Sequence, residues 1–526
     1  MFKKLAASSC LCGSLLLLGG CLIGPRYHIP FPFPHRQATP AGYKESPANF
    51  KTAKGWKVAQ PDAAMLIGKW WTVYHDPELN RLEDSLEINN QNIKEYFENF
   101  MEARALIAEV NSQLYPTLTA DASYTRSFTP EHNSGGSSSA QTAASSAAGG
   151  ETGGSIVSAA SKASPITAIM TSLNLSWEPD LWGRIRNQLR AAQYSAQVSA
   201  AELANERLTE EASLAVYYFE MRGQDALIKL YMDTIEADRK ALDYTKSQYE
   251  TGITDQIAVV EATNTLQNAQ ATATNLGVLR AQYEHAIAVL VGRVASGFGV
   301  GAMPLAGEPP AIPVGVPSQL MERRPDVAAS ERTMAAANAD IGMAEAAYFP
   351  TVTISSQNGF QSDAFKDLFD VNNHFWSTGG SVSETIFDAG LRTATVHQYV
   401  ATYNSDLAAY RQAILTAFQQ VEDYLAQVRI LSQQLILQRD AVKSAQQYLK
   451  LEMDRYRTGI DPYVDVVTAQ TTLLTDQQTA VDAQVQEMTG SVQLIEALGG
   501  GWDRSQLPSA HDVSKWPRRS ETQINQ

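Results

Sequence analysis

The chain has 526 residues, of which 44% are hydrophobic and 9% aromatic, and it carries a formal net charge of −15. This apolar content excludes general disorder, and the absence of any run of about 18 apolar residues excludes a protein that crosses a membrane through several helices. The acidic charge argues against nucleic acid as a partner, because phosphate binding needs a basic surface. A transmembrane β-structure stays open, since alternating strands leave only a weak hydropathy signal.

The first residues of the chain have the layout of a bacterial export signal. Two lysines precede an apolar run, and all three cysteines of the chain lie in this segment. Leu18–Cys21 resembles a lipobox, in which the signal peptide 1–20 is removed and Cys21 is acylated, and Leu22 after the cysteine favours the outer membrane. Several acyl chains, at about 0.8 kcal/mol per buried CH₂, would anchor the chain in lipid. The alternative is an ordinary signal peptide in which the cysteine is incidental.

Two parts of the chain repeat each other. Tyr249–Gln270 and Tyr456–Gln477 share ten of 22 residues, and further upstream Tyr115–Thr119 resembles Phe349–Thr353. The first copy is lengthened by a Ser/Gly/Ala-rich tract at Glu131–Ser164, whose composition indicates a flexible exposed loop. Each copy predicts the same order of elements: helix, strand, loop, strand, very long helix, tight turn and helix.

The repeat also divides the chain into segments. We expect an N-terminal extended or equatorial segment after the signal peptide, two repeats joined by a linker, and a polar C-terminal tail. The boundaries expected for these five segments are 21–77, 78–292, 293–317, 318–499 and 500–526.

Four segments have the period-two pattern of strands. After Pro116, apolar residues such as Leu118 and Tyr124 alternate with hydroxyl-bearing residues such as Thr117 and Thr119. Each strand is about ten residues long, which is enough to cross a bilayer at a tilt, although the same periodicity fits a half-buried sheet in a soluble protein. The expected strands cover about 117–129, 166–177, 351–360 and 376–387.

The predicted helices are unusually long. The segment 184–250 contains no proline and predicts a helix of 67 residues, about 100 Å at 1.5 Å per residue, and 392–458 is its counterpart. Shorter helices are expected after each turn, over 255–291 and 462–498. The last of these carries two apolar seams, whereas a two-stranded coiled coil needs one per helix. Two seams favour a helix with neighbours on both sides, as in the wall of a tube; burial of a broad face in a thick bundle is the alternative.

Four strands per chain are too few to close a barrel, because the smallest transmembrane barrels have about eight. Open strand edges in lipid leave backbone groups without hydrogen bonds, at a cost of several kcal/mol each. If the strands span a membrane, several chains must share one barrel. Two chains would give a barrel filled by its own side chains, so a conduit favours three.

Motifs are distributed over nearly the whole length that follows the signal peptide. They are Gly24–Tyr27, Trp70-Trp71, Asp76–Leu79, Ser176–Arg184, Arg323–Val327, Ala335–Gly342, Phe349–Thr351 and Ile386–Gly390. Each motif alone is modest, but their order and spacing are specific. Together they resemble the outer membrane efflux lipoproteins of the TolC/NodT type, the outer membrane factors of RND-class tripartite pumps.

The resemblance implies an α+β membrane protein that is a homotrimer. Its twelve-stranded outer-membrane β-barrel would continue into a periplasmic α-helical coiled-coil barrel. Its partners would be a periplasmic membrane-fusion adaptor protein, an inner-membrane RND transporter and outer membrane lipid. The protein would be a passive exit duct for drugs or other small molecules, not an enzyme, and would need no cofactor. Two alternatives stay open: an outer membrane channel for type I protein secretion, and a periplasmic coiled-coil lipoprotein without a pore.

The resemblance also places a gate at the periplasmic end of the tube. In this family the helix turns at that end close like an iris. By the repeat, these turns are expected at Thr251–Gln256 and Thr458–Tyr463. Gly252 and Gly459 lie where each long helix must end, as glycine does just after a helix C-terminus.

Three aspartates near these turns are candidates for the gate or selectivity site. Asp465 lies where the family often has a constriction-lining aspartate, Asp461 precedes it in the same turn, and Asp255 belongs to the first turn. Three copies would place several carboxylates around one opening, which raises their pKa values and favours cations. Because Asp461 precedes Pro462, capping of the next helix is the alternative role for it.

Signals of chemistry are missing from the sequence. It contains no GxSxG, HExxH or P-loop pattern, and its eight histidines lack the spacing of metal ligands. Gly297–Gly301 follows a predicted helix rather than a strand, so it indicates a linker instead of a nucleotide site. We therefore expect no catalytic residue and no metal, and we expect Arg323 and Arg324 to form structural ion pairs.

Overall fold

The computed structural model describes residues 22–32, 40, 42–45, 68–128, 165–312 and 317–515. Contacts divide the chain into two units. The first contains 109–189 and 342–396 together with the described residues before Pro25, and the second contains the remainder. Each unit takes residues from both halves of the chain, so the units do not coincide with the two successive repeats, whose boundaries stay a prediction. Cys21 and the Ser/Gly-rich loop lie outside the described residues.

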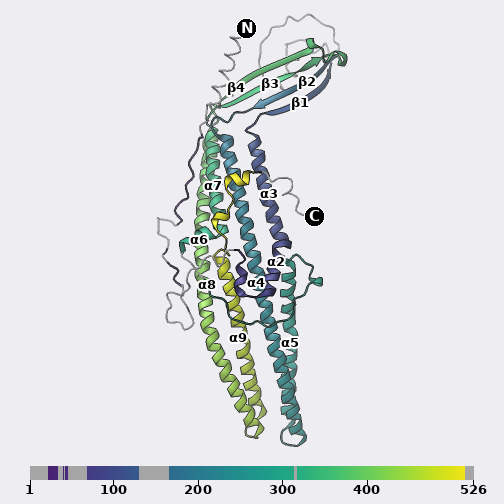
Figure 1. Cartoon of the computed structure of the whole chain (residues 1–526), viewed down its shortest axis with the longest axis vertical. Coiled ribbons are helices and arrows are strands. Elements are labelled where there is room, and N and C mark those ends of the chain that lie inside the picture. The colour runs from purple at the N-terminus through teal and green to yellow at the C-terminus, as the bar shows by residue number, and fades with distance from the viewer. Residues whose placement is uncertain are drawn as a thin grey trace. The chain divides into compact units, whose positions relative to one another are not determined.

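A four-stranded antiparallel sheet forms most of the first unit, with its strands in chain order (Figure 1). The strands are β1 Thr117–Ser127, β2 Ile166–Trp177, β3 Thr351–Ser362 and β4 His374–Ser383. The pairing of β2 with β3, which runs from Ile169↔Ser362 to Trp177↔Ile354, joins the two halves of the chain. Strands β1 and β4 are the edges, and each has one hydrogen-bonded neighbour among the described strands.

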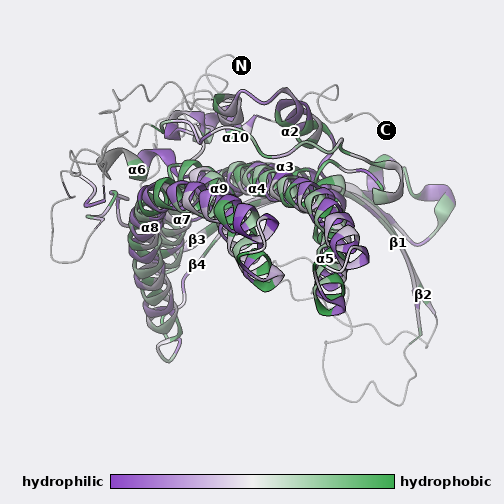
Figure 2. Cartoon of the chain, turned by 90° about the horizontal axis from the view of Figure 1, so that it is seen from below, coloured by the Kyte–Doolittle hydropathy of each residue, from purple (hydrophilic) through white to green (hydrophobic). Residues whose placement is uncertain are grey.

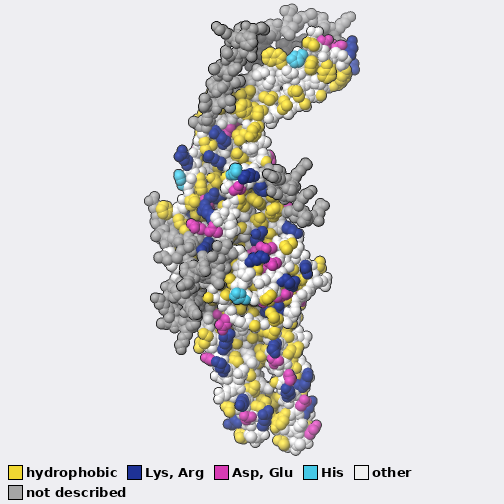
Figure 3. Space-filling view, viewed as in Figure 1, with side chains coloured by type: hydrophobic (Ala, Val, Ile, Leu, Met, Phe, Trp, Pro, Cys, Tyr) yellow, Lys and Arg dark blue, Asp and Glu magenta, His cyan; other side chains and the backbone are white. Residues whose placement is uncertain are grey.

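The apolar side chains of this sheet are largely exposed in the single chain. Leu118, Tyr124, Leu173 and Trp376 each leave more than half of their surface accessible. In β1 the large apolar residues Leu118 and Tyr124 lie on one face, because successive side chains of a strand alternate between faces. Figure 3 shows apolar side chains spread over the sheet. Such a face favours apolar surroundings that the chain's own core does not supply.

The fourth strand ends earlier than the sequence predicts. The alternation predicts a strand over 376–387, but β4 ends at Ser383. Asp388 explains the difference: its Oδ1 accepts a hydrogen bond from Gly390 N at 2.9 Å, and its Oδ2 accepts one from Arg392 Nε at 2.7 Å. These bonds turn the chain into the following helix, and Ala389 adopts a φ of 50° in the turn. The prediction of strand at 384–387 is therefore wrong.

Four long helices dominate the second unit, and the first turns of α4 and α8 belong to the first unit. Seen along their axes, the helices of the second unit lie side by side in one curved layer (Figure 2). The α4–α5 turn and the α8–α9 turn lie at the same end of this unit (Figure 1). These long helices are α4 Arg184–Glu250, α5 Gln256–Leu290, α8 Leu391–Arg457 and α9 Tyr463–Ala497. None of the helices in the described residues combines the length and apolar character needed to cross a bilayer.

The other described helices are shorter than these four. Asp76 caps α2, because its Oδ1 accepts hydrogen bonds from Glu78 N at 2.9 Å and Leu79 N at 3.2 Å. The α-helices are α2 Pro77–Asn89, α3 Gln91–Ser112, α6 Pro317–Arg323, α7 Pro325–Ala346 and α10 Ala510–Ser514. The 3₁₀ turns are η4 Trp70–Tyr74, η6 Ala295–Gly297, η7 Phe365–Asp367, η8 Val371–Asn373 and η9 Arg504–Gln506.

The largest apolar core of the second unit joins η4 and α2 to the long helices. Trp70 and Trp71 are fully buried in it with Leu79, next to residues of α4, α5 and α9. We call the η4–α2 segment, Trp70–Asn89, the belt. The double tryptophan motif is thus a structural anchor, because aromatic side chains of this size contribute large buried areas.

Two matching hydrogen bonds hold the ends of α5 and α9. Asn90 Nδ2 donates to Leu290 O at 3.0 Å, and Arg324 Nη1 donates to Ala497 O at 3.0 Å. The two donors, Asn90 and Arg324, are 234 residues apart, which is also the separation of the repeated segments that begin at Tyr115 and Phe349. The two acceptors, Leu290 and Ala497, are 207 residues apart, which is also the separation of those that begin at Tyr249 and Tyr456. An internal structural repeat predicts such equivalent contacts.

Candidate functional site

The two helix turns share one backbone geometry. Gly252 and Gly459 have φ values of 73° and 76°, in the left-handed region. In the first turn Gly252 N donates to Tyr249 O at 3.0 Å and Ile253 N donates to Gln248 O at 2.8 Å. Equivalent bonds, at 2.9 and 3.0 Å, join Gly459 N to Tyr456 O and Ile460 N to Arg455 O. Both turns are Schellman motifs, in which glycine avoids the steric cost that a Cβ meets at positive φ.

Asp461 is paired with an arginine from the end of the preceding helix. Arg455 Nη2 donates to Asp461 Oδ1 at 2.9 Å, and Arg455 Nε donates to Oδ2. The carboxylate side chain is 17% exposed, whereas the guanidinium side chain is 55% exposed. The hydrogen bond from Arg455 holds the pKa of Asp461 below its usual value. Asp461 is therefore ionised at neutral pH, and its charge is largely compensated within the same chain.

The expected capping role belongs to a different aspartate. The N-cap of α9 is Pro462, without a side-chain hydrogen bond, so Asp461 does not cap that helix. Asp255, one of the three candidates, is the N-cap of α5: its Oδ1 accepts a hydrogen bond from Ala258 N at 3.1 Å. Asp255 has a structural role in this turn, and any role in a gate stays a prediction.

Asp465 lies in the first turn of α9 and is half-buried in the single chain. It belongs to a charged group of which the sequence predicts only the two aspartates. Partial desolvation and a hydrogen bond to Asp461 raise the pKa of Glu452, which also feels the negative charge of Asp465. The structure therefore gathers Glu452, Arg455, Asp461 and Asp465 at one turn. The sequence gives no signal for Glu452 and Arg455, because their contacts depend on where the chain returns after the turn.

An apolar cluster holds the four long helices together beside the turns. It joins Leu242 of α4, Ala262 of α5, Tyr456 of α8 and Val466 of α9, each of them buried. The Tyr456 hydroxyl also lies 3.4 Å from Thr245 Oγ1, a contact between the two helical hairpins. These contacts keep the two hairpins of one chain packed against each other at this end.

The remaining site predictions concern the lipid anchor and metal binding. The described chain begins just after the predicted acylation site Cys21. Tyr27 donates through its hydroxyl to Glu331 of α7, which also accepts from Arg332 Nε at 2.7 Å and from Arg504 Nη2 at 3.1 Å. This buried carboxylate fixes the segment around Tyr27 to α7. Across 22–32, 68–128, 165–312 and 317–515, acidic, histidine and cysteine side chains form no group that could hold a metal ion.

Comparison with known proteins identifies the family. The model of the outer membrane efflux protein family matches residues 82–293 and 316–500. The probable efflux pump outer membrane protein TtgC of Pseudomonas putida is 29% identical over 490 residues, which cover 92% of this chain and 94% of TtgC. The outer membrane protein OprJ of Pseudomonas aeruginosa is 29% identical over 503 residues, 94% of this chain and 96% of OprJ.

A solved structure has the same fold. The outer-membrane channel OprN superimposes with a TM-score of 0.78 at 24% identity, over 92% of this chain and all of that one. The family match covers well over half of the sequence, so the chain belongs to the outer membrane efflux protein family and is a protein of the bacterial outer membrane. The resemblance identified from the sequence motifs is thereby confirmed.

Proposed function

We propose that three copies of the chain form one passive exit duct, the outer membrane component of a tripartite efflux system. Each chain contributes four strands to a closed twelve-stranded barrel and one curved layer of helices to a tube. The observation that carries this proposal is the sheet: it has two edges and exposed apolar side chains. Free edges are not tolerated in lipid, because backbone groups without partners cost several kcal/mol each. Pairing of β1 with β4 of the next copy satisfies both edges.

The helical layer supports the same assembly. Val278 and Val289 of α5 are 53% and 71% exposed, and Leu437 and Leu451 of α8 are 71% and 54% exposed. These two helices carry apolar side chains that the single chain leaves in contact with solvent. Contact with α5 or α8 of a neighbouring copy buries them at about 25 cal/mol per Å². A head-to-tail interface of this kind closes into a ring when the rotation between copies allows it.

At the helix turns, three copies bring Asp465 and Asp461 around one opening. Arg455 compensates Asp461 within the chain, so Asp465 contributes most of the uncompensated charge. A ring of carboxylates favours cations and disfavours anions. Asp465 is thus the main selectivity residue, Asp461 is held in place by Arg455, and Asp255 caps its helix. Gly252 and Gly459 provide the turns on which this mouth is built.

The partners follow from the family. The chain takes its cargo from an inner-membrane RND transporter through a periplasmic adaptor, performs no chemistry, and is anchored to outer membrane lipid through acylated Cys21. Efflux by a pump is what the name of the relative TtgC states. We extend that role to this chain, with drugs or other small molecules as cargo.

Planar bilayer recording of the purified protein tests the function. Asp465→Asn is expected to lower the cation-to-anion permeability ratio several-fold, because it removes one carboxylate per chain from the mouth. Asp440→Asn is the control, since this exposed aspartate pairs with Lys443 far along α8 and makes the same change of charge. Equal selectivity of both variants and the parent would remove Asp465 from the mouth, and the absence of single-channel steps would reject the duct itself.

A further inference from the structure

Two carboxyl groups, of Glu83 and Glu211, are buried where the belt packs on α4. Glu83 of α2 is 0% exposed and Glu211 of α4 is 6% exposed. Among the described residues, neither oxygen of Glu83 has a hydrogen-bond partner. Glu211 Oε2 accepts one hydrogen bond, from Trp70 Nε1 of η4 at 2.9 Å. A buried carboxylate without compensation is costly, so such groups take up a proton instead.

The surroundings add negative charge rather than compensate it. On α2, Asp84 and Glu87 both disfavour ionisation of Glu83. On α4 the opposing charge is the exposed Arg207, and in front of η4 Lys69 is engaged by Asp84. The apolar side chains that α5 and α9 bring to this core include Ile287, Met488, Val492 and Ile495, and α9 also brings the buried Ser491.

This environment determines the protonation of the pair. Burial raises the pKa of Glu211 to about 7, and burial together with the Glu211 charge raises the pKa of Glu83 well above its usual value. Both shifts favour the protonated carboxyl, so ionisation of the pair moves toward alkaline pH.

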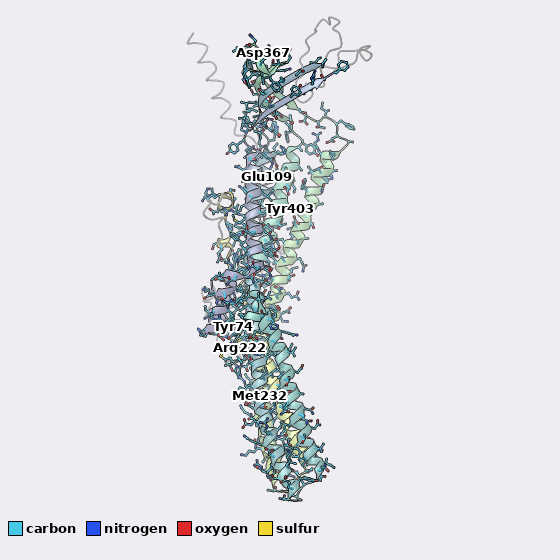
Figure 4. All side chains as sticks on the ribbon, turned by 90° about the vertical axis from the view of Figure 1, so that its right-hand side faces the viewer. Tyr74, Glu109, Arg222, Met232, Asp367 and Tyr403 are labelled. Carbon is cyan, nitrogen blue, oxygen red and sulfur yellow. The ribbon has the colours of Figure 1, made fainter. Side chains whose placement is uncertain are left out.

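The pair lies where the belt packs on the long helices. Tyr74 Oη lies 2.7 Å from Ser491 Oγ of α9, and Tyr218 Oη of α4 donates to Asp76 Oδ2 at 2.6 Å. Figure 4 shows Tyr74 and Arg222 at adjacent levels of this region. The sequence position that the repeat makes equivalent to Glu211 is Phe418, which packs on Tyr43. The fold thus tolerates an apolar residue where α4 carries an acid.

We propose that the Glu83–Glu211 pair is a proton-dependent latch: protonated, it holds the belt on α4, and loss of its proton in alkaline medium releases the belt. The release follows from repulsion between two buried carboxylates, because the buried Arg222 beside this core is already paired with Asp225. The latch lies within one chain, so it stands apart from the question of whether the assembled protein conducts.

Hydrogen–deuterium exchange of the purified full chain in detergent tests the latch. Protection of the α2 amides, corrected for the intrinsic effect of pH on exchange, is expected to fall about tenfold between pH 6 and pH 9. In Glu83→Gln the protection is expected to stay constant, because the amide cannot ionise. Glu98→Gln, which changes an exposed acid on α3, is the control and keeps the response of the parent.

A second variant keeps the test decisive if Glu83→Gln folds poorly. Glu211→Gln retains a carbonyl oxygen for the Trp70 indole and is expected to show the same constant protection. Protection of α2 that does not change with pH in the parent would overturn the latch. The same conclusion would follow if both glutamine variants kept the parent's pH dependence.

Discussion

Charge is compensated unevenly among the residues of the α8–α9 turn. Arg455 compensates Asp461 directly, through a hydrogen bond at 2.9 Å, and leaves Asp465 without such a partner on α8 among the described contacts. Removal of the arginine changes the electrostatic field at the turn and leaves both aspartates in the sequence.

Arg455→Gln is therefore expected to increase cation selectivity, because it exposes one further carboxylate per chain at the mouth. The reversal potential in a salt gradient measures this. Arg439→Gln, which removes an arginine paired with Glu308 far from the turn, provides the comparison. A shift toward anions in Arg455→Gln would contradict the placement of Asp461 at the opening.

Asp238 of α4 is a buried acid. It is 3% exposed, and one of its carboxylate oxygens has no hydrogen-bond partner among the described residues. Burial raises the pKa of Asp238 to about 6 from an ordinary value of 3.8. The unfolded chain ionises this group at lower pH than the native one, so native stability falls as pH rises between these values and stays lower above them.

Asp238→Asn is expected to be more stable than the parent by up to about 3 kcal/mol at pH 8 and equal to it near pH 3. Thermal unfolding of the purified protein at several pH values measures the difference. A stability difference that does not depend on pH would show that the native carboxyl ionises at its ordinary pKa and that burial does not raise it.

Single-residue roles were only partly predictable from the sequence. The positions Gly252 and Gly459 could be assigned because a long helix must end where a glycine permits positive φ. The Arg455–Asp461 pair could not, because it depends on where the chain returns after the turn. The same holds for Glu83 and Glu211, which lie far apart in the sequence and meet only through packing of α2 on α4.

At the scale of elements, the turns depend on one backbone conformation. A Cβ on Gly459 would meet nothing within 4 Å, so its cost is that of the φ of 76° alone. Gly459→Ala is expected to lower the free energy of unfolding by about 1 kcal/mol. Denaturant unfolding of the purified protein measures this.

Gly277→Ala serves as the matched control for this substitution. Gly277 lies inside α5, also with nothing within 4 Å of its Cβ position. Alanine there is expected to stabilise by about 0.5–1 kcal/mol, because it has the higher helix propensity. Effects of the same sign in both variants would rule out turn strain as the cause.

Hydrophobic periodicity predicts the bounds of the long helices more precisely than those of the strands. The long helix α4 spans Arg184–Glu250, since no proline or capping signal interrupts its apolar pattern. Strand β4 is less regular in sequence, and the Asp388 turn ends it before the predicted Ile386 and Phe387. Local side-chain hydrogen bonds of this kind override alternation.

For the whole molecule, one consequence follows from the two sheet edges. If β1 and β4 of neighbouring copies pair, a cysteine at Ala122 in β1 and a second cysteine scanned along β4 should form an intermolecular disulfide at one register. Denaturing gels without reductant should then show ladders up to the trimer. A cysteine placed in β2 instead of β1 should give no ladder, because β2 pairs on both sides with strands of its own chain.

The proposed duct requires three copies of the chain in one assembly. Native mass spectrometry of the protein purified from outer membranes in detergent measures it directly. We predict a complex of three chains, each of 57.4 kDa less the signal peptide and plus its acyl chains. A stable single chain, or a complex of two, would contradict it, because neither provides the strands needed for a closed conduit.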